Sequence, residues 1–136
     1  REEDLVYYNR ALGETDPLLV DPQYAAQYSP TGHVIAHPCF LVAVVFHCLG
    51  PKGHGTWLRT PAARNPFQEI ELHEPIFVGE RITLTFTPVD RFIRRGKHYI
   101  TNLNEFRGSA NTLKARWWAT LILPPTREEI SRYVNA

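Results

Sequence analysis

Residues 38–49 (PCFLVAVVFHCL) decide the fold of this chain, because they form its longest apolar stretch. Gly50 and Pro51 follow directly, and such a pair ends a helix. We predict a helix over 38–49 that is apolar nearly all round, so other elements must enclose it. A membrane-spanning helix needs about 20 apolar residues, so this segment is predicted to be a buried helix and not a membrane anchor.

The sequence after this helix changes to the pattern of β-strands. Four stretches are rich in β-branched and aromatic residues with partial alternation, at 67–72, 81–89, 98–106 and 113–123. Turn sequences separate them at 94–97 (RRGK) and 107–109 (RGS). Pro88 lies inside one stretch and predicts an edge strand or a bulge there. A capping box at 126–129 (TREE) predicts a short final helix.

Two short helices are predicted before the apolar one, at 2–12 and 22–28. Gly13 can end the first, and Asp21 followed by proline caps the second. The order of helices and then antiparallel strands predicts one α+β domain, residues 1–136, with a sheet of about five strands wrapped around the apolar helix. Because one such sheet leaves part of that helix uncovered, we expect a second copy or a related chain to cover it.

The composition of the chain excludes several classes of function. With 136 residues, 43% of them hydrophobic and 21% charged, it is an ordinary globular domain. A net charge of +1 gives no reason to expect a nucleic acid or a membrane as partner. Cys39 and Cys48 fit buried, reduced thiols of a cytoplasmic protein, and no histidine pair with zinc-like spacing predicts a metal. No secretion signal opens the chain, and we expect a short leader to be missing before Arg1.

Three segments resemble the signature of the MaoC-like (R)-specific enoyl-thioester hydratases and dehydratases, in the family's order. They are residues 8–19 (YNRALGETDPLL), 34–40 (VIAHPCF) and 70–82 (IELHEPIFVGERI), and the likeness extends from residue 2 to about 123. The most similar variant is the MaoC N-terminal, or FAS1-like, dehydratase domain, which holds the acyl chain beside a catalytic half. The resemblance implies the hotdog fold and no cofactor.

The resemblance places residues of different chemistry at the family's catalytic positions. The family's reaction needs a carboxylate and an imidazole to share the protons of water, and backbone N–H groups to bind the thioester oxygen. In this chain Glu14 stands at the aspartate position, one methylene longer, and Leu19 stands at the histidine position. Pro38 stands at the glycine position and has no N–H. We therefore expect a vacated active site and assign no catalytic residue.

Substrate binding is expected at two places. The mouth of the apolar helix should bind the acyl chain through Leu19, His37, Cys39 and Phe40. The basic turn could meet the phosphates of a coenzyme A or phosphopantetheine arm through Arg94, Arg95 and Lys97, although a solvated turn explains the same residues.

The leading hypothesis is that this chain is the acyl-thioester-binding, non-catalytic half of an (R)-specific enoyl-CoA hydratase or 3-hydroxyacyl-thioester dehydratase, a hydro-lyase. It would bind an acyl-CoA or acyl-carrier-protein thioester and join a catalytic MaoC-like subunit in a heterodimer or a dimer of heterodimers, with a homodimer as fallback. Two alternatives stay open. One is a self-sufficient hotdog hydratase or thioesterase that uses Glu14 with His37 or another histidine, and the other is an acyl-thioester binding or scaffold module.

Overall fold

The structure is a computed structural model that describes residues 1–48, 64–123 and 128. Within these ranges the helices are α1 (Glu2–Ala11), α2 (Pro17–Val20), α3 (Pro22–Tyr28) and α4 (Phe40–Cys48). The strands are β1 (Arg64–Leu72), β2 (Thr83–Arg94), β3 (Lys97–Arg107) and β4 (Leu113–Ile122), with a short 3-10 helix at Ser109–Asn111. The predicted α+β order, helices first and antiparallel strands second, is confirmed.

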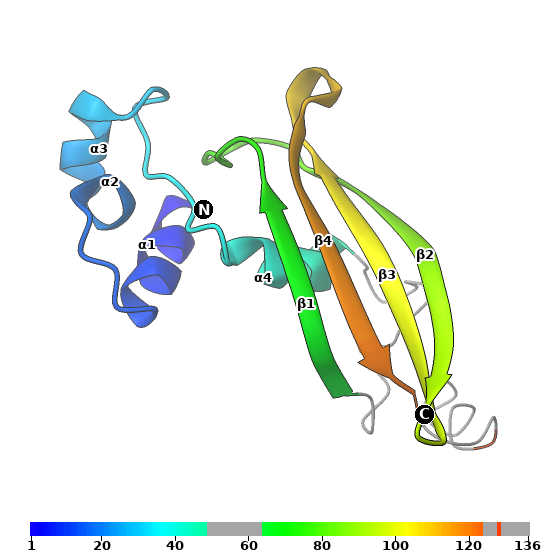
Figure 1. Cartoon of the computed structure of the whole chain (residues 1–136). Helices are drawn as coiled ribbons and strands as arrows, with labels where there is room; N and C mark the ends of the chain where they lie inside the picture. Colours follow the sequence, from blue (N-terminus) through cyan, green and yellow to red (C-terminus); the bar gives the residue numbers. More distant parts are fainter. Residues whose placement is uncertain (49–63, 124–127, 129–136) are drawn as a thin grey trace.

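The strands form an antiparallel sheet in the order β1-β4-β3-β2 (Figure 1). The prediction was about five strands, and the described ranges contain four, plus an isolated bridge between Ile35 and Phe77. The expectation for Pro88 is confirmed, because β2 ends the strand order and its register shifts between Pro88 and Asp90. The β2–β3 turn is a two-residue hairpin whose central residues, Arg95 and Gly96, both have positive φ, as a type I′ turn requires.

Helix α4 packs against one face of this sheet. Leu41 and Val45 are buried there in a core with Phe106, Ala115, Trp117 and Ala119. On the same helix Val42 and Val44 are only half-buried in the isolated chain. The helix begins two residues later than predicted, at Phe40, because residues 38–39 form a turn closed by N–H to C=O bonds over three residues. Its predicted end at residue 49 lies outside the described residues.

Helices α1 and α3, together with the segment that leads into α4, build a second, smaller core from Leu5, Ala25, Val34 and Ala36. Helix α3 has its predicted bounds, and α1 ends one residue earlier than predicted. Helix α2 was not predicted, although Asp16 caps it by accepting the N–H of Leu18 at 2.9 Å. Of the predicted final helix, only Glu128 is described. No helix in the described ranges is long and apolar enough to cross a membrane.

A buried ion pair links the segment before β2 to β4. The Nζ atom of Lys114 lies 2.9 Å from Oε1 of Glu80, and the two side chains are only 7% and 11% exposed. Gly108 packs directly against this pair, so that a Cβ atom at this position would overlap the Glu80 carboxylate and the Lys114 stem. Its φ of −89° is open to any residue, so space and not backbone freedom requires glycine here.

We therefore expect Gly108→Ala to lower the free energy of unfolding by about 1–3 kcal/mol, because the added methyl must displace a buried ion pair. Urea denaturation followed by circular dichroism measures the change. Ser109→Ala, an exposed position in the same loop, serves as the control and should change stability by less than about 0.5 kcal/mol. Equal midpoints for the two variants would show that Glu80 and Lys114 move aside freely.

Candidate functional site

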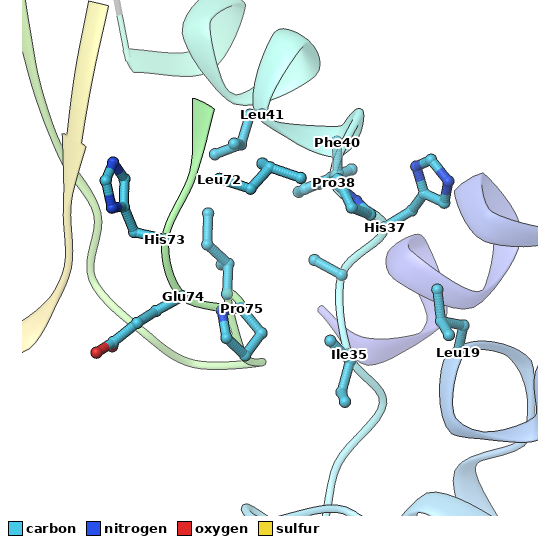
Figure 2. Close-up of a pocket in the computed structure, with 12 residues that line it drawn as sticks. Leu19, Ile35, His37, Pro38, Phe40, Leu41, Leu72, His73, Glu74 and Pro75 are labelled. Carbon is cyan, nitrogen blue, oxygen red and sulfur yellow. The ribbon is translucent and has the colours of Figure 1, made fainter. Parts of the chain in front are cut away.

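A largely apolar cavity of about 310 Å³ lies between the segment that leads into α4 and the segment that leaves β1 (Figure 2). One wall consists of Leu19, Ile35, Ala36, His37 and Pro38. The opposite wall consists of Leu72, His73, Glu74, Pro75 and Ile76, and helix α4 adds Phe40 and Leu41. Pockets for small organic ligands begin at about 300 Å³, so the cavity has room for a small ligand.

The structure brings most of the residues expected at the helix mouth to this cavity. Leu19, His37 and Phe40 line it, as does Pro38. Cys39 does not line it and is exposed. The expectation of a buried thiol is therefore wrong for Cys39, while the side chain of Cys48 lies outside the described part of the chain.

The basic turn lies far from the cavity within one chain. Lys97 opens β3 at the turn, whereas Phe106, near the other end of β3, pairs with Ala115, which in turn pairs with Leu72 of the cavity wall. At about 3.3 Å per residue the nine positions from 97 to 106 span roughly 30 Å. Figure 1 shows the turn and the end of β1 at opposite ends of the sheet. Arg94, Arg95 and Lys97 therefore do not share a site with Leu19 and His37 in a single chain.

Glu14 and His37 form a carboxylate–imidazole pair at the edge of the cavity. His37 Nε2 lies 3.1 Å from Glu14 Oε1, and the side chains are 20% and 33% exposed. The other ring nitrogen, Nδ1, accepts the backbone N–H of Cys39 at 3.0 Å. An Nδ1 atom that accepts a hydrogen bond carries no hydrogen, so the neutral ring bears its hydrogen on Nε2. This N–H donates a hydrogen bond to the Glu14 carboxylate. The structure thus assembles the pair that a self-sufficient enzyme would use.

The backbone N–H groups around the start of α4 are all engaged within the chain. From residue 34 to 42, every N–H has an acceptor, and Pro38 has no N–H to offer. The acceptors are, in chain order, Glu2 Oε1, Leu18 O, Ile76 O, Asn9 Oδ1, His37 Nδ1, His37 O, Pro38 O and Cys39 O. No backbone donor in this stretch is therefore available to a negatively charged oxygen that develops on a ligand.

Two residues of α1 support the site and were not predicted to do so. Asn9 is fully buried, and its carboxamide bonds the backbones of three cavity residues. The Tyr8 hydroxyl donates to the Cys39 carbonyl oxygen at 3.0 Å, and its ring packs edge-on against Phe40. Burial, aided by the nearby Cys39 thiol group, raises the pKa of Tyr8, so it remains a donor at neutral pH. The available sequence signal was a polar residue four positions after Leu5, on the buried face of α1.

Comparison with known proteins shows the fold. No family model matches this sequence, and no curated protein is similar to it in sequence. Several solved structures are similar, and three of them show the likeness. The (R)-hydratase from A. caviae involved in PHA biosynthesis has a TM-score of 0.69 at 20% identity, over 90% of this chain and 87% of that chain. A MaoC-like dehydratase has a TM-score of 0.75 at 20% identity, over 93% of this chain and 39% of that chain.

The third is the HadBC (3R-hydroxyacyl-ACP dehydratase) complex from Mycobacterium tuberculosis, with a TM-score of 0.72 at 15% identity, over 89% of this chain and 85% of that chain. This chain therefore has the fold of the MaoC-like hydratases and dehydratases, and the predicted hotdog fold is confirmed. A structural likeness at 20% sequence identity or below shows a shared fold and not a shared activity.

Proposed function

We propose that this chain is the acyl-binding, non-catalytic half of a MaoC-type enoyl-thioester hydratase or 3-hydroxyacyl-thioester dehydratase. The observation that carries the proposal is the engagement of every backbone N–H around the start of α4, together with Pro38, which has none. Hydration of a 2-enoyl thioester builds negative charge on the thioester oxygen, and that charge needs preorganised donors. A site without free donors at this place can bind a thioester but gives its reaction little help.

The lining of the cavity supports an acyl chain as the ligand. Leu19 stands where the resemblance expects an imidazole, and most of the surrounding side chains are apolar. Burial of apolar surface favours binding by about 25 cal/mol per Å². The ligand we propose is an acyl-CoA or acyl-carrier-protein thioester whose acyl part enters between the two walls.

A catalytic partner of the same fold would complete the enzyme. Val42 and Val44 of α4 remain half-buried in the single chain, which leaves apolar surface for a second subunit to cover. HadBC, a neighbour in fold, is named as a complex, and this chain spans 39% of the MaoC-like dehydratase chain. We propose a hotdog subunit with intact aspartate and histidine as the partner.

Binding measurements test the ligand. We expect octanoyl-CoA to bind at least about tenfold more tightly than free coenzyme A in isothermal titration calorimetry, because each buried methylene contributes up to about 0.8 kcal/mol. Leu19→Glu should abolish most of this gain by placing a charge in the cavity. Leu12→Glu, a matched change at an exposed leucine outside the cavity, should leave it intact. Equal affinities of the wild type for octanoyl-CoA and coenzyme A would refute the acyl site.

The contact between Glu14 and His37 favours a second candidate, a self-sufficient hydratase. In that reaction Glu14 would accept a proton from water as the oxygen of water bonds to C3 of the 2-enoyl thioester. The protonated Glu14 would then give this proton to C2, which regenerates the carboxylate. His37 would orient the carboxylate through its Nε2–H. The two candidates differ in one measurable respect, which is turnover by the chain without a partner.

A further inference from the structure

One buried carboxamide holds two separate segments of the first cavity wall through three hydrogen bonds. The Nδ2 group of Asn9 donates to the carbonyl oxygens of Leu19 at 2.8 Å and Ile35 at 3.1 Å. Its Oδ1 atom accepts the N–H of His37 at 3.2 Å. All three partners line the cavity, whereas Asn9 is fully buried behind them. The side chain has both donors and its acceptor engaged, so a shift of any one segment costs a buried hydrogen bond.

One buried lysine holds the opposite wall in a similar way. The carbonyl oxygen of Lys114 accepts the N–H groups of His73 at 2.9 Å and Glu74 at 3.1 Å. Its ammonium group donates to the carbonyl oxygen of Pro75 at 3.2 Å and pairs with Glu80 at 2.9 Å. His73, Glu74 and Pro75 line the cavity, and Lys114 lies behind them with 7% of its side chain exposed.

The two walls are joined to each other at one side of the cavity. The N–H of Ala36 donates to the carbonyl oxygen of Ile76 at 3.1 Å, and Ile35 forms a bridge with Phe77. Beyond this junction, within the described part of the chain, hydrogen bonds hold each wall to its own support and not to the other wall. The separation of the walls therefore depends on how firmly Asn9 and Lys114 hold them.

We propose that Asn9 and Lys114 are positioning residues that fix the width of the cavity and thereby its preference for unbranched over branched acyl groups. The inference rests on the proposed acyl-binding function. Neither residue touches the ligand. They act through the backbones of the wall residues, so that loss of one of them lets a wall move and admits a broader acyl group.

Two acyl groups of equal carbon number test this preference. We expect the wild type to bind octanoyl-CoA at least about tenfold more tightly than its isomer 2-ethylhexanoyl-CoA, because a packed apolar site discriminates by such factors against a misplaced methylene. Asn9→Ala should bring the ratio of the two dissociation constants below about threefold, chiefly because the affinity for the branched ligand rises. If this variant does not fold, Asn9→Ser, which puts a hydroxyl group in place of the carboxamide, takes its place.

A matched control separates positioning from general stability. Asn104 is also fully buried, and its amide donates to the carbonyl oxygen of Trp117, but it does not line the cavity or bond its walls. Asn104→Ala should reduce stability and leave the ratio unchanged. Amide hydrogen exchange gives an independent reading, since Asn9→Ala should accelerate exchange of the His37 N–H far more than that of core amides in β3.

The outcomes distinguish this inference from the function on which it rests. A lower ratio with faster His37 exchange in the Asn9 variant supports the inference. If the Asn9 variant keeps the wild-type ratio, the positioning role of Asn9 is wrong, while the acyl-binding function is unaffected. A wild type that binds neither isomer overturns the acyl-binding function, and the inference with it.

Discussion

Lys114→Met is expected to lower the free energy of unfolding by about 3–5 kcal/mol, because it leaves the Glu80 carboxylate buried without its cation. The Lys114 and Glu80 side chains are 7% and 11% exposed, so water cannot take over the role of the ammonium group. The change also removes the hydrogen bond from Nζ to the carbonyl oxygen of Pro75. Urea denaturation monitored by circular dichroism measures the loss.

Two further variants make this result specific. The double variant Lys114→Met with Glu80→Leu should recover part of the lost stability, because it removes both charges. Recovery should be incomplete, since Glu80 also accepts the N–H of Phe77 at 3.3 Å. Arg116→Met, two positions along the same strand, removes a cation that is 36% exposed and pairs with Glu71 and Glu105, and should cost less than about 1 kcal/mol. Equal losses for Lys114→Met and Arg116→Met would contradict the buried-pair account.

Elements with a strong local signal could be predicted from the sequence. Helix α3 was predicted with its observed bounds, because Asp21 and Pro22 mark its start and a Ser-Pro-Thr-Gly segment follows its end. Asp16 and Pro17 carry the same start signal, yet the helix they open has four residues, which is too short for any periodicity. The missing N–H of proline predicted an edge strand or a bulge at Pro88, and β2 ends the strand order and has a register shift there.

The cavity could be predicted in part. The resemblance led to Leu19, His37 and Phe40, all of which line it. Asn9 was missed because its bonds reach residues 10, 26 and 28 positions away, and no local pattern reports such contacts. The contact of Glu14 with His37 also depends on how α1 docks against the start of α4, so the sequence left it as an alternative.

For the basic turn, the sequence predicted the local structure but not its position relative to the cavity. Its hairpin was predicted from the Arg-Gly pair, and the structure has that hairpin. Whether it could reach the acyl site depended on the direction and length of β2 and β3, which carry Arg94 and Lys97 to the far end of the sheet. If the turn binds the phosphates of an acyl thioester, the acyl group must therefore lie in the cavity of another subunit.

Introduction of the catalytic pattern of the MaoC-like hydratases should create activity in this chain. We expect the triple variant Glu14→Asp, Leu19→His and Pro38→Gly to hydrate a 2-enoyl-CoA at a measurable rate, and the wild type and each single variant to show none. The acid–base pair and the oxyanion donor each contribute about 10²- to 10⁴-fold, and they act as a unit. Loss of ultraviolet absorbance of the conjugated enoyl thioester measures the rate.

The structure explains why three changes are needed together. Leu19→His supplies an imidazole on the cavity wall, but the new side chain must find a hydrogen-bond partner where leucine needed none. Glu14→Asp shortens the side chain and so withdraws the carboxylate from its present contact with His37 Nε2 at 3.1 Å. Pro38→Gly adds an N–H at the start of α4, where the existing N–H groups are already engaged.

A matched control identifies the new N–H as the donor. Pro22 is another proline at the start of a helix, the first residue of α3, but it lies outside the cavity lining. The triple variant with Pro22→Gly in place of Pro38→Gly should therefore stay inactive. Turnover by the unaltered chain decides between the two candidate functions. If the wild type alone hydrates 2-enoyl-CoA and loses at least about 100-fold on Glu14→Gln or His37→Ala, the existing pair is the catalytic one. The non-catalytic assignment is then wrong, and the self-sufficient hydratase replaces it.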